Sequence, residues 1–208
     1  MAQASVQRQV LPQRLMQAIV HSSQSSFVAA HGEVHYLAIS TAGDAPELLE
    51  GLELLRGETK PARPLSAMAF KTSAGSRAVT PGSIRPTAMI DPVEALSSGH
   101  YQVVEIGKRG DLDGAFPERI SVGRAANKDI VLRHESVSKF HGWFEVDSAL
   151  SLYVVDAGST NHTVVRSRQL TARAREPVPP GTPIRFGSID TFVVDAESLW
   201  TAFRSRSA

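Results

Sequence analysis

From about residue 98 onward, apolar and polar residues alternate with a period of two. Such alternation is typical of strands that bury one face, and short runs separated by Gly-, Asp- and Pro-rich turns indicate an antiparallel β-sandwich. The turns fall at 110–114, 156–158 and 179–181. The expected strands are 101–107, 119–122, 129–132, 141–146, 152–156, 163–165, 184–186 and 191–195, followed by a closing helix over 195–204.

The chain before this region has a mixed pattern. Apolar residues recur at helical spacing over 11–30 and again over 44–57, and the segment 33–40 between them is β-prone. The sequence therefore predicts a small α+β region over 1–70, and a Ser/Thr/Pro-rich extended linker over 71–97. A mainly β domain with a C-terminal helix is expected over 98–205.

The composition supports a packed core, because 42% of the 208 residues are hydrophobic and 21% are charged. The net charge is +1, from 22 Lys and Arg against 21 Asp and Glu, so anion recognition requires a local cluster. The chain has no cysteine, which excludes a disulfide, a thiolate zinc site and an iron–sulfur cluster. No run approaches the roughly 18 apolar residues of a membrane helix. We expect a soluble cytoplasmic protein without metal or cofactor, which binds neither membranes nor nucleic acid.

Four short fragments within the β region carry the candidate chemistry. They occupy residues 123–124, 138–141, 158–163 and 184–187, each at a predicted strand end or loop. A sandwich gathers its loops at two ends, so fragments far apart in the sequence can form one site on a rigid scaffold.

The side chains in these fragments suit a doubly charged oxyanion attached to a peptide. Arg124 offers a guanidinium, Lys139 an ammonium, Ser138 a hydroxyl and Asn161 an amide. A phosphothreonine carries a charge of about −1.5 to −2 and three strong acceptor oxygens. The fragments therefore predict a phosphopeptide site.

In order and spacing, the fragments resemble the forkhead-associated (FHA) pattern of Gly-Arg, Ser-x-x-His and Gly-Ser-Thr-Asn-Gly-Thr, over about residues 98–195. The resemblance implies an FHA-like antiparallel β-sandwich (SMAD/FHA type) that binds phosphothreonine peptides and catalyses no reaction. It implies that Arg124, Ser138 and Lys139 contact the phosphate. Thr160 would support the phosphothreonine contact, and Asn161 would hold the peptide main chain.

Other matching positions would shape the loops. The resemblance assigns this role to Gly123, His141 and Gly158. His162 departs from the pattern, since the family usually has Gly there. If the position needs a positive φ, His adopts it with modest strain, and the loop and Asn161 would be displaced. In an alternative interpretation, His162 stands near the phosphate and assists when protonated.

The expected partner is a threonine-phosphorylated protein, such as a Ser/Thr kinase or its substrate, and the chain would be an adaptor in kinase signalling or regulated assembly. Thr80 and Thr87 are candidate self-ligands in the linker. The stretch 166–175 carries four arginines. It is interpreted either as a solvated loop or as a segment that contacts peptide residues beyond the phosphate.

Two other classes stay open. One is a phospho-independent assembly module on a degenerate FHA fold, which His162 would favour. The other is an enzyme within residues 1–70, against which stands the lack of a Gly-rich phosphate loop or nucleophile elbow there. The pair His31 and His35 does not form the zinc-protease motif, and no third ligand is evident.

Overall fold

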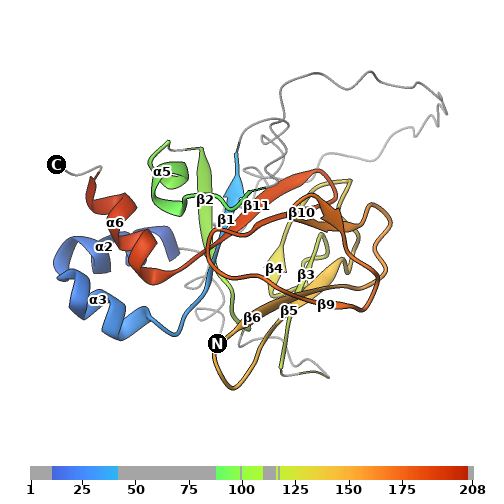
Figure 1. Ribbon diagram of the computed structural model, residues 1–208, viewed down its shortest axis with the longest axis horizontal. Helices are drawn as coiled ribbons and strands as arrows, with labels where there is room; N and C mark the ends of the chain where they lie inside the picture. Colours follow the sequence, from blue (N-terminus) through green and yellow to red (C-terminus); the bar gives the residue numbers. More distant parts are fainter. Residues whose placement is uncertain (1–10, 42–87, 99, 110–115, 117, 206–208) are drawn as a thin grey trace, which may run out of the picture.

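Two sheets face each other and a group of helices lies beside one of them in the computed structural model (Figure 1). The structure describes residues 11–41, 88–98, 100–109, 116 and 118–205. In these parts of the chain, no helix is long and apolar enough to cross a membrane.

The first sheet has six strands and combines the two ends of the described chain. All its pairings are antiparallel. Its order is β2 (Tyr101–Glu105), β1 (Tyr36–Ser40), β11 (Ile189–Val194), β10 (Pro183–Phe186), β7 (Thr163–Val165) and β8 (Arg168–Gln169).

The second sheet has five strands and is antiparallel apart from the parallel pair β3–β4. Its order is β4 (Ile130–Val131), β3 (Arg119–Gly123), β5 (Gly142–Val146), β6 (Leu152–Asp156) and β9 (Arg175–Pro177).

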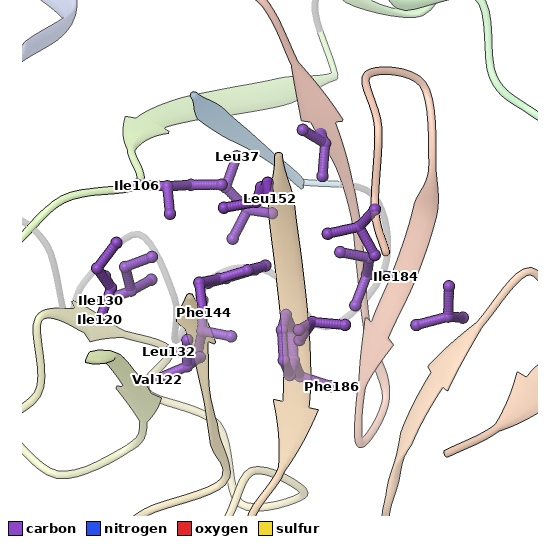
Figure 2. Close-up of a cluster of buried hydrophobic side chains, with 14 of the residues drawn as sticks. Leu37, Ile106, Ile120, Val122, Ile130, Leu132, Phe144, Leu152, Ile184 and Phe186 are labelled. Atoms are coloured by element: carbon purple, nitrogen blue, oxygen red, sulfur yellow. The ribbon is translucent and has the colours of Figure 1, made fainter. Parts of the chain in front are cut away.

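The main core fills the space between the sheets, as Figure 2 shows. Cross-strand neighbours such as Ile120, Phe144 and Val154 point inward from the second sheet and meet Ile184 and Phe186 from the first. Phe144 and Phe186 contact edge to face at 6.0 Å. Full burial of each such side chain contributes about 1.5–3 kcal/mol, so this core fixes the frame from which the loops extend.

A second core joins the outer face of the six-stranded sheet to the helices α2 (Leu11–His21), α3 (Gln24–His31), α5 (Pro92–Ser97) and α6 (Ala196–Ser205). Leu199 and Ala202 of α6 are buried there, with Phe27 and Phe192. Asp91 caps α5 by accepting from the backbone N–H groups of Val93 and Glu94, and Pro92 fits the first helical position.

The sequence predicted the fold class correctly: the described chain is mainly β, with two sheets and short helices. Several local expectations differ. The segment 11–30 forms two helices, because Ser23 starts a new one by accepting from Ser26 N–H. Residues 92–97, expected in the linker, form α5.

Strand β1 lies between β2 and β11, so residues 36–40 are part of the six-stranded sheet. The expected helix over 44–57 and the threonines Thr80 and Thr87 lie outside the described residues. The boundaries proposed for the three regions remain a prediction.

Candidate functional site

The site is built where β3 ends beside the loop that connects β4 to β5. The backbone N–H of Arg124 donates to Ser138 O at 3.0 Å, and that of Ala125 donates to Lys139 O at 3.3 Å. A Cβ at Gly123 would lie 2.4 Å from Lys139 O, so only glycine permits this close approach. Arg124 is thereby held next to Ser138 and Lys139.

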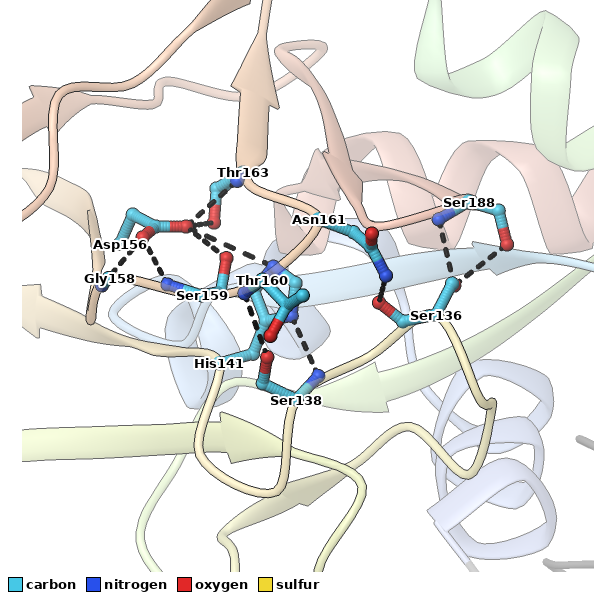
Figure 3. A network of polar contacts seen from close by, with 10 residues as sticks. All are labelled: Ser136, Ser138, His141, Asp156, Gly158, Ser159, Thr160, Asn161, Thr163 and Ser188. Atoms are coloured by element: carbon cyan, nitrogen blue, oxygen red, sulfur yellow. Dashed lines mark hydrogen bonds and ion pairs between the residues drawn. The ribbon is translucent and has the colours of Figure 1, made fainter. Parts of the chain in front are cut away.

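Ser138 connects this loop to the one between β6 and β7. Its Oγ accepts from the backbone N–H of Thr160 at 3.1 Å, and its own N–H donates to His141 Nδ1 at 3.1 Å (Figure 3). Three of the predicted phosphate-site residues, Arg124, Ser138 and Thr160, therefore lie together although they come from three loops.

His141 lies beneath this junction with its side chain fully buried. Because Nδ1 accepts the N–H of Ser138, the ring proton of the neutral form is assigned to Nε2, which lies 3.9 Å from Asp156 Oδ2. Burial lowers the pKa of His141, although the His162 backbone and the charge of Asp156 act in the opposite direction. The ring is thus a neutral, positioned support for the loop.

Asp156 at the end of β6 is the centre of the β6–β7 loop. Its carboxylate is almost fully buried and accepts five hydrogen bonds of 2.7–2.9 Å (Figure 3). The donors are the N–H of Gly158, the N–H and hydroxyl of Ser159, and the N–H and hydroxyl of Thr163. These bonds fix both ends of the segment that presents Thr160 and Asn161.

The ionised form of Asp156 is the one that suits this cage of donors. Burial alone would raise the pKa of the carboxyl, but hydrogen bonds from Thr163, Ser159 and Gly158 outweigh it and the pKa lies below its ordinary value. The sequence predicted only a turn at 156–158. An Asp two residues before Gly is the signal for an Asx turn that could have revealed it.

Asn161 is anchored on the other side of the site. Its Nδ2 donates to Ser136 O at 2.9 Å. The Oγ of Ser136 in turn accepts from the N–H of Ser188 at 2.9 Å and lies 2.7 Å from His134 Nδ1. Ser136 therefore ties the β4–β5 loop to both the Asn161 loop and the β10–β11 turn, a role that no sequence motif indicated.

His162 has the positive φ that the family pattern suggested, at 57°. His tolerates this left-handed region better than a β-branched residue does. Its carbonyl accepts from the N–H of Gly187 at 3.2 Å, and Asn161 beside it keeps its contact with Ser136. Replacement of Gly by His is thus accommodated within an ordered loop.

The groups available to a ligand lie on the outer surface of this junction. Arg124, Lys139, Thr160 and Asn161 are exposed, and Ser138 is half-buried. Within the described part of the chain, the side chains of Arg124 and Lys139 have no hydrogen-bonding or ion-pair partner. The site therefore presents two unpaired cations, two hydroxyls and one amide from a rigid support.

The arginine-rich stretch is mostly engaged within the protein. Arg166 and Arg168 approach Glu176 at 3.5 and 2.6 Å, and Arg175 stacks 3.6 Å from the ring centre of Tyr153. Residues 168–169 form β8 and residues 175–177 form β9. The stretch 166–175 is therefore partly held in strands and is not simply a solvated loop.

The two histidines near the N-terminus have structural contacts. His31 stacks on Phe27 at 4.5 Å and its Nδ1 lies 3.2 Å from the hydroxyl of Tyr36, whereas His35 Nε2 lies 2.9 Å from Leu150 O. Within the described residues no group of three His, Cys, Asp or Glu side chains is placed to hold a metal ion.

A β-sandwich whose loops at one end display exposed cationic and amide side chains has the layout of a recognition module, in which a rigid scaffold positions the residues of its loops. Residues 120–187 match the model of the FHA domain family. The resemblance seen in the sequence is therefore confirmed over residues 120–187. FHA domains are phosphopeptide-binding modules, not enzymes.

Solved structures that resemble the chain include FHA domains from bacteria and yeast. The FHA domain of the CT664 protein from Chlamydia trachomatis is 19% identical, with 47% of this chain and 88% of that chain covered and a TM-score of 0.39. The N-terminal FHA domain of Rad53p from S. cerevisiae, solved with a phosphothreonine peptide, is 16% identical, with 40% and 73% covered and a TM-score of 0.36.

EmbR of Mycobacterium tuberculosis, solved with a low-affinity phosphopeptide, is 22% identical, with 38% of this chain and 20% of that chain covered and a TM-score of 0.34. The comparison with curated proteins gave no match.

Proposed function

We propose that this chain binds a phosphothreonine-containing segment of a partner protein at the loop end that carries Arg124. The observation that supports this most strongly is the pair of unpaired cations beside Ser138: Arg124, whose backbone N–H bonds to Ser138 O, and Lys139, which follows Ser138 in the chain. A charged hydrogen bond from such a group contributes about 1.5–3 kcal/mol. The buried frame beneath them reduces the ordering cost of binding.

Each exposed group has bonding capacity left for a ligand. Ser138 Oγ accepts from Thr160 N–H, which leaves its hydroxyl hydrogen free to donate to a phosphate oxygen. Asn161 uses one amide hydrogen on Ser136 O. Its second N–H and its side-chain oxygen remain to hold the carbonyl and amide of a peptide main chain.

In this role the protein is an adaptor in kinase signalling or regulated assembly, and its partner is a phosphorylated kinase or a kinase substrate. The linker threonines Thr80 and Thr87 are candidate ligands in the same chain or in a neighbour. Analysis of the intact mass after kinase treatment tests this point, since the absence of phosphate on both threonines excludes it.

The outer face of the five-stranded sheet supports a second candidate, a phospho-independent contact. The guanidinium of Arg119 lies 4.3 Å from the ring centre of Phe116 and 4.8 Å from that of Trp143, and Arg175 stacks on Tyr153 nearby. Arg, Trp and Tyr dominate the binding energy of many interfaces. Equal capture of a partner before and after phosphatase treatment selects this function over the first.

The decisive experiment is titration calorimetry with a phosphothreonine peptide and its unphosphorylated form. We expect Arg124→Ala to weaken phosphopeptide binding roughly ten- to hundred-fold, because a charged phosphate contact is lost. Arg168→Ala is the matched control: this exposed arginine pairs with Glu176 beyond the far end of β7. Unchanged affinity of the Arg124 variant, or equal binding of both peptides, contradicts the proposed function.

A further inference from the structure

One large aromatic side chain is exposed beside the candidate phosphate site. Phe140 lies between Lys139 and His141 in the chain, and 44% of it is accessible to solvent. Its ring stacks on Trp143 with 5.9 Å between centroids and 15° between planes. The ring is therefore supported by Trp143 and still partly open to solvent.

Lys128, in the loop that follows Arg124, lies against this ring. Its Nζ is 5.2 Å from the centroid of Phe140. Its backbone is fixed in a turn, since its N–H donates to Ala125 O at 3.2 Å. A cation held over an aromatic face keeps its charge and is limited in the directions it samples.

The electrostatic balance differs between the two flanks of the site. On the Phe140 flank, Arg124, Lys128 and Lys139 have no carboxylate partner among the described residues. The one carboxylate near Lys128 in sequence, Asp129, is fully engaged by Lys108, Arg109 and Ser121. Among the residues that the structure describes, this flank is therefore positively charged.

The opposite flank is formed by Asn161, Ser136 and Ser188, which are joined to one another by hydrogen bonds. These side chains are uncharged, and Arg133 and Glu135, one of each sign, precede Ser136 in the sequence. A peptide that crosses the phosphate position thus meets a flank with Lys128 and Phe140 on one side and a flank lined by Asn161, Ser136 and Ser188 on the other.

We propose that Lys128 and Phe140 form a subsite that selects an acidic residue on one flank of the phosphothreonine. The inference rests on the proposed function and specifies the class of ligand. The carboxylate pairs with the Lys128 ammonium, and the methylene groups of the acidic side chain lie on the exposed part of the Phe140 ring. We expect the Lys128 flank to be read, because the Lys128 ammonium lies over the Phe140 ring and has no carboxylate partner among the described residues.

The test uses three phosphothreonine peptides of equal length: one neutral, one with acidic residues before the phosphothreonine, and one with acidic residues after it. Dissociation constants are measured with the full chain by fluorescence anisotropy at low and high salt. We expect one acidic peptide to bind about two- to five-fold tighter than the neutral one at low salt, the scale of an exposed ion pair. The preference shrinks at high salt.

The variants assign this preference to the subsite. Lys128→Ala removes it, Lys128→Glu inverts it, and Phe140→Ala reduces it, while the neutral phosphopeptide binds each with little change. Arg168→Glu is the control for the change in net charge, because it alters the same number of charges away from the site. It should leave the preference intact.

The outcomes are distinguishable. Equal binding of all three phosphopeptides by the wild-type protein overturns the subsite and leaves the proposed function standing. An equal gain for both acidic peptides, affected alike by Lys128→Glu and Arg168→Glu, reduces it to long-range attraction and also overturns it. Failure of every phosphopeptide to bind removes the proposed function and the subsite together.

Discussion

At the end of the sandwich where the candidate site lies, the buried residues and the exposed residues differ in how their polar groups are bonded. Asp156 is buried and accepts five hydrogen bonds from its own loop. Arg124 is exposed, and its side chain has no described partner. The two residues lie in loops that meet at Ser138, so the contrast belongs to one structural unit.

This difference in burial and bonding indicates that some residues stabilise the fold and others are available to recognise a ligand. An unpaired cation in water costs little, whereas a buried carboxylate requires all its donors. The lower layer therefore holds the loops in place, and the upper layer keeps its hydrogen-bonding capacity for a ligand. Changes below should alter the free energy of unfolding, and changes above should alter affinity alone.

The largest effect is expected from Asp156→Ala. The change leaves the N–H groups of Gly158, Ser159 and Thr163 without their acceptor. Because orphaned buried donors are costly, we expect the free energy of unfolding to fall by roughly 3–5 kcal/mol. Urea denaturation followed by tryptophan fluorescence measures it.

Asp147→Ala is the matched control. Asp147 also accepts from two backbone N–H groups, those of Ala149 and Ser151, and from the hydroxyl of Tyr153, but it lies in the more open β5–β6 turn. Its loss should destabilise the protein less. If both variants unfold at the same urea concentration as the wild type, burial of Asp156 does not hold the loop end together.

A smaller loss of stability is expected when either of two glycines is replaced by alanine. The two glycines share a positive φ but differ in their surroundings. Gly187 has φ 62° and a Cβ there would lie 2.4 Å from Ser136 O, whereas Gly158 has φ 87° and nothing within 4 Å. Gly158→Ala should cost about 1 kcal/mol from backbone strain alone. Gly187→Ala should cost roughly 2–4 kcal/mol, because the clash adds to the strain.

Thermal unfolding of the two variants under the same conditions makes the comparison. A larger loss for Gly158→Ala would contradict the close approach of the β10–β11 turn to Ser136. Phosphopeptide affinity sharpens the result further. Gly187→Ala should also weaken binding, since Ser136 positions Asn161.

The sequence predicted what local patterns encode. Alternation located most strands, and the spacing of the fragments brought Arg124, Ser138 and Asn161 to one end of a sandwich. The motif usually has Gly at the position of His162, which directed attention to the left-handed backbone found there. Each of these features depends on neighbours in the chain or on a pattern that a family shares.

The features that escaped prediction depend on distant contacts. Strand β1 is β-prone by itself, but its place between β2 and β11 is set by pairing across more than 60 residues. Strands β8 and β9 are too short and too exposed to show alternation. The hub roles of Asp156 and Ser136 arise only when several loops meet, so no single segment carries the signal.

The smallest predicted effect is a decline of stability with acid in two steps. Burial lowers the folded-state pKa of His141, so the unfolded chain takes up this proton first as the pH falls. The contribution of a neutral His141 is therefore full at neutral pH and is lost progressively below about pH 6.5. Burial would raise the pKa of Asp156 and Asp129, but their hydrogen bonds lower it overall, so their contributions are lost below about pH 4.

One group acts in the opposite direction. Burial raises the pKa of Asp190 although the charge of Arg185 opposes the shift, so this residue favours the folded state toward acid. We expect the free energy of unfolding to fall overall with acid, because the three groups with a lowered pKa, His141, Asp129 and Asp156, outnumber the one with a raised pKa, Asp190. Urea titrations at about pH 7.5, 5.5 and 3 should show a falling free energy of unfolding, the first step between the first two and the second below about pH 4. A titration of the His141 ring by NMR assigns the first step. Protonation of the ring above the ordinary histidine range would mean that it is not held neutral beneath Ser138. The division between a buried, fully bonded layer and an exposed, unpaired layer would then fail at His141.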